Sequence, residues 1–437
     1  DVLIVGKEET YTFIEKLLQS VKKAFSTRRV HLGMDEAVLL GLGKYLKENG
    51  YEKGSVLIRE HCKRVLAICK KLGLEPMIWS DMYITANTNG GYYEVPADAD
   101  CSSWEKPEKG LGLVYWDYYH DDEKSYEKML NIHKQLSDDV IFAGGSWIWN
   151  GIAPNYSKTF ACTKAALQTC KRYQTKEVLC TAWMDNGAET PVDAVWPGVA
   201  LFAHLGFHLE YNEKVLEEEF KECVGGNLKD FMALDAFDSL FLNGKANQEA
   251  QNPSKYLLYQ DPLAGIFDQE VVKNGVDTGA YYKKLKKMME ICQENSPEYA
   301  ALFAYYEKLA AVLADKADLG VRMKAAYDKK QLLALKEICE KEIPETIQNL
   351  EEMKVLREDL WMSEAKPFGY ELMDVKLGAV ITRLNSTIRR IKKYLDGSIP
   401  CLEELEETRL PYFEKNADKR ENRWSQIISG SDLIDTI

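Results

Sequence analysis

The sequence predicts an α/β protein in which part of a (β/α)8 TIM-type barrel is followed by an α-helical C-terminal domain. Two observations support this fold class. Up to about residue 205, short apolar segments alternate with amphipathic helices, which is typical of a parallel sheet with right-handed crossovers. After that point strand patterns are replaced by helical periodicity. We therefore expect a barrel domain over residues 1–205 and a helical domain over residues 206–437.

Five apolar segments of the first domain have the length and flanks of buried strands. They span residues 29–32, 76–79, 112–116, 140–143 and 177–181. The helix predicted over residues 55–73 carries an apolar stripe of period 3.6, with Ser55 able to cap its start and Gly73 able to supply a left-handed residue after its end. Five such units fit an open doubly wound sheet as well as part of a barrel.

The residues that follow each strand favour the barrel. The strand ends read GMDEA, WSDMY, YWDYYH, GGSWIW and AWMDNGAE, so each carries a tryptophan, a tyrosine or an acid. Active sites of (β/α)8 barrels lie at this C-terminal end of the strands. Neither a GxGxxG motif nor a P-loop is present, so we predict no nucleotide and no other cofactor.

Helical periodicity dominates the second domain. Helices are predicted over residues 227–240, 280–295, 298–314, 329–362, 373–395 and 401–407, with a proline-punctuated loop over residues 252–268. The long helices can pack on the barrel or form a homodimer, and the sequence leaves both arrangements open.

Charge and cysteine usage restrict the partners and the compartment. The net charge of -13 argues against nucleic acid and against an anionic membrane surface as partners. No apolar run approaches the roughly 18 residues that span a bilayer. The ten cysteines form no CxxC pair, so we expect free thiols in a reducing bacterial cytoplasm.

The histidines do not predict a metal site. Only His204 and His208 have an HxxxH spacing, and the stretch HLGFH lacks the glutamate of an HExxH motif. Both lie among apolar residues, so helix packing is the favoured interpretation of this pair.

Aromatic and acidic side chains that meet in one cleft are suited to binding a sugar. Pyranose rings present apolar C–H faces that pack on indole rings, and hydroxyls that donate to carboxylates. A single tryptophan in an apolar run is more often a core residue, and we expect that of Trp116. Three tryptophans at strand ends, Trp79, Trp147 and Trp183, favour a sugar site instead. Asp81 and Asp117 fit a loop cap as well as a ligand contact.

Several of these motifs together resemble a known family. The stretch VHLGMDEA resembles the H-x-G-G-D-E signature of family 20 glycoside hydrolases, the β-N-acetylhexosaminidases. Tyr115-Trp116-Asp117 resembles the family's Y-x-D, and Trp183-Met184-Asp185 resembles its W-x-E with aspartate in place of glutamate. GMDEA, GGSW and W-x-D-N-G-x-E-T-P in this order look most like the bacterial branch related to the streptococcal hexosaminidase.

The resemblance implies an exo-acting enzyme that removes terminal β-linked GlcNAc or GalNAc from oligosaccharides or glycosides. In this family the substrate's own 2-acetamido group is the nucleophile, so the reaction is substrate-assisted and retaining. Glu36 would be the acid/base, Asp35 would accept the acetamido N–H, and Tyr115 would donate to the acetamido oxygen. The implied sugar-binding residues are Trp79, Trp104, Asp117, Trp147, Trp183 and Asp185. His31 within the signature is either a catalytic residue or a histidine bonded to the backbone.

In the family the Asp-Glu pair closes the fourth barrel strand, so the five predicted strands would be strands 4–8. Only 28 residues precede the first of them. We therefore expect that the N-terminal strands are missing from this chain, with an open five-stranded domain as the alternative. The alternative function is a non-catalytic amino-sugar-binding or scaffold protein on a degenerate, truncated barrel. A metal-dependent hydrolase using His31, Asp35 and Glu36 is a third and weaker interpretation.

Overall fold

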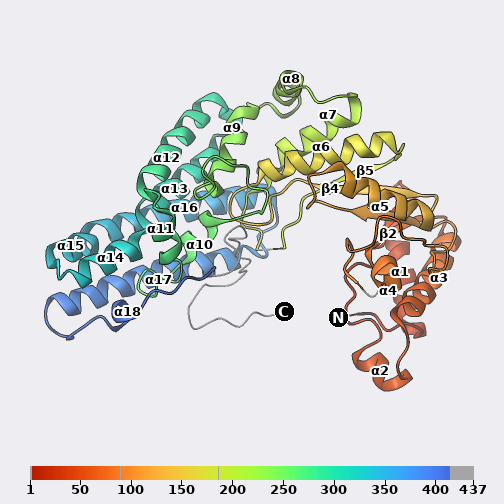
Figure 1. Cartoon of the computed structure of the whole chain (residues 1–437), viewed down its shortest axis with the longest axis horizontal. Coiled ribbons are helices and arrows are strands. Elements are labelled where there is room, and N and C mark those ends of the chain that lie inside the picture. The colour runs from red at the N-terminus through yellow and green to blue at the C-terminus, as the bar shows by residue number, and fades with distance from the viewer. Residues whose placement is uncertain (1, 89, 186, 414–437) are drawn as a thin grey trace. The chain divides into compact units, whose positions relative to one another are not determined.

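The computed structural model of the chain describes residues 2–88, 90–185 and 187–413 (Figure 1). Asn186 of the predicted W-x-D-N-G motif and the end of the predicted helical domain lie outside the described residues. The chain divides into two compact units. The first contains Asp1–Gly145 and Cys162–Thr181, and the second contains Ser146–Ala161 and Ala182–Ile437. Each unit is considered by itself.

The first unit contains one parallel sheet of five strands. They are β1 (Arg29–His31), β2 (Glu75–Trp79), β3 (Gly112–Trp116), β4 (Val140–Gly145) and β5 (Val178–Thr181), and they pair in the order of the sequence. All five predicted strands are confirmed, with ends that shift by no more than two residues. A doubly wound sheet reverses its strand order at a switch point, whereas a barrel keeps neighbours in sequence order. The observed order is that of consecutive strands of a (β/α)8 barrel.

The strand register places three aromatic side chains on one face of this sheet. His31 pairs with Met77, and Trp79 pairs with Val114. Paired residues of parallel strands point to the same face, and so do residues two apart on one strand. His31, Trp79 and Trp116 therefore share a face, which we call the aromatic face.

Helices cover the opposite face of the sheet. Val30 and Leu32 pack against a core formed by α1 (Glu8–Ala24) and α3 (Gly54–Leu72). The ring of Tyr115 contacts α5 (Glu123–Leu136) through His133, at 4.8 Å between ring centroids. Figure 1 shows α5 beside the strands of the sheet. The aromatic face is thus the face that would point into a barrel.

The remaining helices of the first unit connect the strands. They are α2 (Gly43–Asn49), α4 (Asp81–Thr88) and the larger part of α6 (Tyr156–Arg172), whose first turns belong to the second unit. Gly73 is left-handed after α3, with φ 70°, as predicted. The predicted cap at Ser55 is wrong, because the helix already begins at Gly54 and Lys53 precedes it without a side-chain cap.

Every regular element among the described residues of the second unit is a helix. The α-helices wholly inside it are α7 (Trp196–Phe207), α8 (Glu213–Val224), α9 (Leu228–Met232), α10 (Pro253–Tyr259), α11 (Asp268–Asn274), α12 (Thr278–Asn295), α13 (Ala300–Lys316), α14 (Leu319–Asp328), α15 (Leu332–Glu337), α16 (Ile343–Glu364), α17 (Tyr370–Leu395) and α18 (Glu403–Glu406). The long helices pack in sequence, α12 on α13, α13 on α16 and α16 on α17.

Two predictions for the helical domain are wrong in detail. The helix expected over residues 329–362 starts later, at Leu332, because Lys330 is left-handed at φ 54°, and it contains a π-helical turn, Ile338–Glu342, between α15 and α16. The loop expected over residues 252–268 contains α10, which starts with Pro253. Proline is tolerated in the first turn of a helix because the N–H that it lacks would have no partner there.

All ten cysteines are free thiols, as predicted, and seven of them are buried. Among the described helices none is long and apolar enough to cross a membrane.

Candidate active site

The Asp35–Glu36 pair lies on a strained loop directly after β1. Gly33, Met34 and Glu36 all have left-handed backbones, with φ of 71°, 70° and 45°. This conformation is uncommon for residues other than glycine, and it concentrates at functional sites when the surroundings hold it in place. Both carboxylates of the pair are exposed. The loop therefore presents two adjacent acids to solvent at the C-terminal end of a strand.

Asp81 holds this loop from the next strand end. Its Oδ2 accepts a hydrogen bond from the Glu36 backbone N–H at 2.9 Å, and its Oδ1 accepts one from Trp116 Nε1 at 3.4 Å. Asp81 is 4% exposed. Burial raises the pKa of Asp81 to about 6, the two hydrogen bonds oppose the rise, and the charge of Asp35 adds to it. One buried carboxylate thus connects three neighbouring strand ends.

Aromatic residues contact the loop that carries the acids and the Asp81 side chain that holds it. His31 packs on Trp79 with 4.3 Å between ring centroids, and the backbone N–H of Trp79 donates to the Gly33 carbonyl at 3.1 Å. Trp116 lies between Tyr92 and Tyr118, stacked on each at 4.9 and 5.6 Å.

The prediction that Trp116 is a core residue is wrong. Its side chain is only half-buried, whereas the alternate residue Tyr115 is fully buried. The physical reason is the strand alternation itself, which turns Tyr115 toward α5 and Trp116 toward the aromatic face.

His31 was predicted to be either catalytic or bonded to the backbone, and the structure shows the backbone bond. Its Nδ1 accepts from the Gly33 N–H at 3.1 Å, which leaves the proton on Nε2. That Nε2 atom is buried and has no hydrogen-bond partner among the described residues. Burial lowers the pKa of His31 and the charge of Asp35 opposes this. A neutral N–H donor therefore lies beside Trp79 on the aromatic face.

Tyr115 and Asp117 bond to each other. The Tyr115 hydroxyl donates to Asp117 Oδ2 at 2.7 Å, and Asp117 also accepts from His120 Nδ1 at 2.8 Å and from the backbone N–H of Tyr119 at 3.0 Å. Both side chains are buried, and burial together with the charge of Asp117 raises the pKa of Tyr115 well above its ordinary value. Their predicted contacts with a sugar stay predictions.

The remaining predicted sugar-binding residues divide between the two units. Trp104 is half-buried in the first unit, where its backbone N–H donates to the Cys101 carbonyl at 3.2 Å. Trp147 is in the second unit, buried and stacked on Trp149 at 4.3 Å. In the same unit Trp183 is half-buried and Asp185 is exposed. The roles of these residues stay predictions.

Sequence reasoning did not place Asp81 and Trp116 at the site. For Trp116 a signal was present, because it lies two residues after Val114 on β3, and Val114 pairs with Trp79 on the aromatic face. Asp81 lies after β2, at the start of α4, so strand alternation does not place it. The acid that follows β2 was interpreted as either a cap or a ligand contact. Its observed partner, the backbone of Glu36, is 45 residues away in the sequence.

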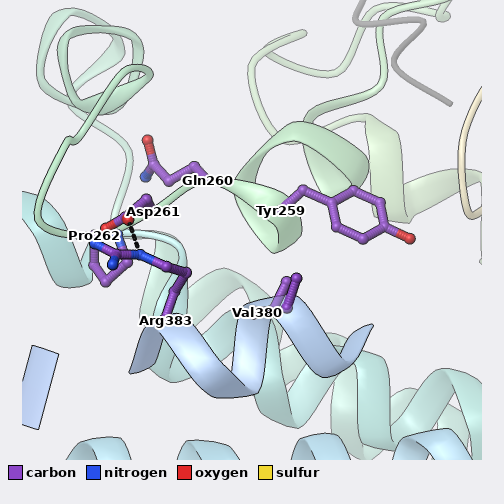
Figure 2. A pocket seen from close by; sticks show the side chains of 7 residues that line it. Tyr259, Gln260, Asp261, Pro262, Val380 and Arg383 are labelled. Atoms are coloured by element: carbon purple, nitrogen blue, oxygen red, sulfur yellow. Dashed lines mark hydrogen bonds and ion pairs between the residues drawn. The ribbon is translucent and has the colours of Figure 1, made fainter. Parts of the chain in front are cut away.

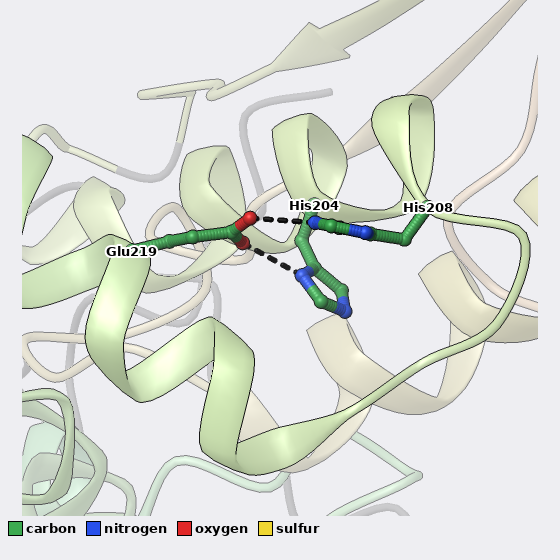
Figure 3. Close-up of side chains that lie close together, drawn as sticks. All are labelled: His204, His208 and Glu219. Atoms are coloured by element: carbon green, nitrogen blue, oxygen red, sulfur yellow. Dashed lines mark hydrogen bonds and ion pairs between the residues drawn. The ribbon is translucent and has the colours of Figure 1, made fainter.

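His204 and His208 do not simply pack in a helix. Both imidazoles bond to the Glu219 carboxylate, His204 Nδ1 to Oε2 at 2.7 Å and His208 Nε2 to Oε1 at 2.6 Å (Figure 3). Among the described residues this is the one group of three donors close enough to hold a metal ion. The interpretation of His31, Asp35 and Glu36 as a metal site is therefore not supported.

The hydrogen bonds of this cluster argue against a metal there too. The Asn212 N–H donates to His204 Nε2 at 3.1 Å, which places the proton of the neutral imidazole on Nδ1. A histidine that binds a metal through Nδ1 needs its proton on Nε2, usually donated to an acceptor. The cluster instead ties the end of α7 to α8, because one carboxylate accepts from two imidazoles.

Two family models match the chain. A model described as the catalytic domain of glycosyl hydrolase family 20 matches residues 1–119, which include Asp35, Glu36, Asp81 and Trp116. A model described as the Glycoside Hydrolase 20C C-terminal domain matches residues 229–424, which form most of the helical unit. No curated protein matches the chain.

Proposed function

The chain belongs to glycoside hydrolase family 20, and from this premise we propose that it is an exo-acting β-N-acetylhexosaminidase that works by substrate assistance. Enzymes of this family act on substrates that contain N-acetylhexosamine. The observation that supports the proposal most directly is the loop at the end of β1. It lies within the matched catalytic region and presents Asp35 and Glu36 side by side.

The first chemical step breaks the glycosidic bond. The carbonyl oxygen of the 2-acetamido group attacks the anomeric carbon while Glu36 donates its proton to the departing glycosidic oxygen. The products are the free aglycone alcohol and a bicyclic oxazolinium ion. Asp35 accepts a hydrogen bond from the acetamido N–H, so its negative charge stabilises the positive charge that develops on this group.

The second step restores the enzyme. Glu36, now a carboxylate, takes a proton from a water molecule that attacks the anomeric carbon from the side of the departed aglycone. The oxazolinium ring opens and the acetamido group is regenerated. Two inversions at one carbon give overall retention.

Asp81 holds the acid/base in position, and the aromatic face supplies groups that can contact a sugar ring. Because Asp81 accepts from the Glu36 backbone, the acid/base is attached to two strand ends. Trp79 and Trp116 offer rings on the same face, and His31 offers a buried N–H donor. These features support a pocket for a sugar ring beside the two acids.

Hydrolysis of chromogenic glycosides tests the proposal. We expect cleavage of β-GlcNAc and β-GalNAc derivatives, with the β-anomer of the free sugar as the first product by NMR. The corresponding β-glucoside, which lacks the acetamido group, should be nearly inert. Equal cleavage of the β-glucoside would refute substrate assistance, and binding without any cleavage would favour the sugar-binding alternative.

Some finer assignments are proposals as well. The match to the 20C C-terminal domain supports the pairing of a family 20 catalytic region with this C-terminal domain, and the bacterial, streptococcal-type branch stays a prediction. The ten free thiols support a reducing cytoplasm as the location. A homodimer through the long helices of the second unit is a further proposal, and sedimentation of the purified chain would test it.

A further inference from the structure

The end of the loop of residues 182–190, from Gly187 to Glu189, is held by buried charges of the second unit. This loop follows β5 and carries Trp183 and Asp185, two of the predicted sugar-binding residues. Its last acid, Glu189, is 2% exposed. Glu189 Oε1 lies 2.5 Å from Lys376 Nζ on α17, and Glu189 Oε2 lies 3.5 Å from Lys255 Nζ on α10.

A third cation holds the backbone of the same loop. Arg357 on α16 is fully buried, and it donates from Nε to the Glu189 carbonyl at 3.2 Å and from Nη2 to the Ala188 carbonyl at 3.2 Å. The loop needs such support, because Ala188 has a left-handed backbone at φ 53°. A residue other than glycine keeps this conformation only where its surroundings impose it.

The close approach of Lys376 restricts the loop sequence. Gly187 has φ 109°, and a Cβ atom at this position would collide with Lys376 Nζ. A residue with a side chain would therefore both strain the backbone and displace the ammonium group. Gly187 and Lys376 are thus matched, although they are far apart in the sequence.

The helices that supply these cations are themselves connected. Arg383 lies two turns after Lys376 on α17, and its Nε is 2.5 Å from Oδ2 of Asp261, just past the end of α10 (Figure 2). The pocket at this ion pair has about 10 Å³ of space, enough for roughly one water molecule. It is too small to hold a sugar, so we interpret the contact as structural. It fixes α10 and α17 relative to each other.

We propose that Lys376 and Arg357 are positioning residues, which hold the loop of residues 182–190 so that Trp183 and Asp185 can bind the sugar. The inference rests on the proposed function for its substrate. It gives α16 and α17 a positioning role, because the charges that hold this loop come from these two helices. Neither residue touches the reacting atoms in this scheme.

The test compares two lysines that lie on the neighbouring helices α16 and α17, only one of which contacts the loop. Lys376→Met removes the partner of Glu189. Lys354→Met is the matched control, because Lys354 on α16 pairs with Asp374 on α17 at 3.7 Å, outside the loop. Since Lys376→Met leaves a buried carboxylate short of a partner, the double variant Glu189→Gln/Lys376→Met serves if the single variant does not fold.

We expect KM for the chromogenic β-GlcNAc substrate to rise about ten- to a hundred-fold in Lys376→Met and in Glu189→Gln/Lys376→Met, with a smaller change in kcat. Hydrogen exchange of residues 182–190 should become faster. Lys376→Arg should recover most of both properties, and Lys354→Met should match the wild type. Trp183→Ala should raise KM much less when it is added to Lys376→Met than when it is made in the wild type, since both changes act on one loop.

Unchanged exchange in the loop, or an unchanged KM with fully additive effects of Trp183→Ala, would overturn the inference. A wild-type enzyme that cleaves neither β-GlcNAc nor β-GalNAc would refute the proposed function instead. In that case, hydrogen exchange in the Lys376→Met and Lys354→Met variants still decides whether Lys376 holds the loop.

Discussion

The backbone N–H of Glu36 donates to the side chain of Asp81 at 2.9 Å, although the two residues belong to different strand ends. Glu36 has a left-handed backbone at φ 45°, a conformation that its own side chain disfavours. The hydrogen bond gives that conformation a buried partner. Asp81 is therefore placed to fix the direction of the Glu36 carboxylate without being exposed itself.

Replacing Asp81 should impair catalysis more than folding. Asp81→Ala removes the acceptor, so the loop can relax and the Glu36 carboxylate should lose its alignment. We expect kcat for β-GlcNAc hydrolysis to fall about ten- to a hundred-fold. Asp81→Asn keeps one acceptor oxygen and should fall less. Asp122→Ala is the control, because Asp122 caps α5 in the same unit and should affect stability only. A wild-type kcat in Asp81→Ala would contradict this role.

The same carboxylate should appear in the pH dependence of stability. Its pKa is raised by burial from 3.8 to about 6 in the folded state. The folded state therefore binds the proton more tightly, and the contribution of Asp81 to stability is fully present below pH 3.8 and is lost as the pH rises through about 6. Asp81→Asn does not titrate. The free energy of unfolding of this variant minus that of the wild type should rise between pH 4 and 6.5 and then stay constant.

Urea unfolding at closely spaced pH values measures this difference. Comparing the two proteins cancels the titration of all other groups, provided that they keep their surroundings. A difference that is flat from pH 4 to 7 would show that the pKa of Asp81 is not raised in the folded protein.

Sequence patterns predicted the strands well because each strand is a short apolar run between helices. The three central strands are mostly buried in the parallel sheet, where apolar runs are continuous, whereas the edge strands β1 and β5 are only partly buried. Gly112–Trp116 was predicted to the residue. The faces were harder to predict. Alternation shows that Tyr115 and Trp116 point in opposite directions, but only the pairing register and the position of α5 show which one faces the helices.

Contacts over long sequence distances explain the other misses. The partner of Glu36 is Asp81, and the partners of Glu189 are lysines on α10 and α17. No periodicity within a segment reports such a pair. Likewise HLGFH lacks a nearby glutamate of the expected motif, and the acid that binds both histidines, Glu219, comes from the following helix.

The two acids of the pair should respond differently to the leaving group. Glu36→Gln removes proton transfer, which contributes roughly 10²- to 10⁴-fold. The loss should shrink for substrates with very acidic leaving groups, since these depart without protonation. Asp35→Asn should slow all substrates alike, because the acetamido group must be held whatever the leaving group. Measuring kcat/KM over a series of aryl β-GlcNAc substrates separates the two roles. Parallel leaving-group plots for the two variants would contradict this assignment.

A variant of Tyr115 tests whether its hydroxyl stabilises the fold through Asp117 or contacts the substrate, as predicted from the sequence. In the structure it donates to Asp117 at 2.7 Å and is fully buried. Tyr115→Phe should therefore cost about 1–3 kcal/mol of unfolding free energy, because a hydrogen bond to a buried carboxylate is lost. The value of kcat should change less than about three-fold.

The buried Tyr126 is the matched control for this change. Its hydroxyl donates to the neutral carbonyl of His120, so Tyr126→Phe should cost less stability than Tyr115→Phe, again with little change in kcat. If Tyr115 instead aimed the acetamido group, its variant would lose activity for N-acetylated substrates at nearly unchanged stability. Urea unfolding and kcat measured on the same preparations distinguish the two roles, because a bond to Asp117 is lost from the free enzyme whereas a bond to the acetamido oxygen exists only with substrate bound.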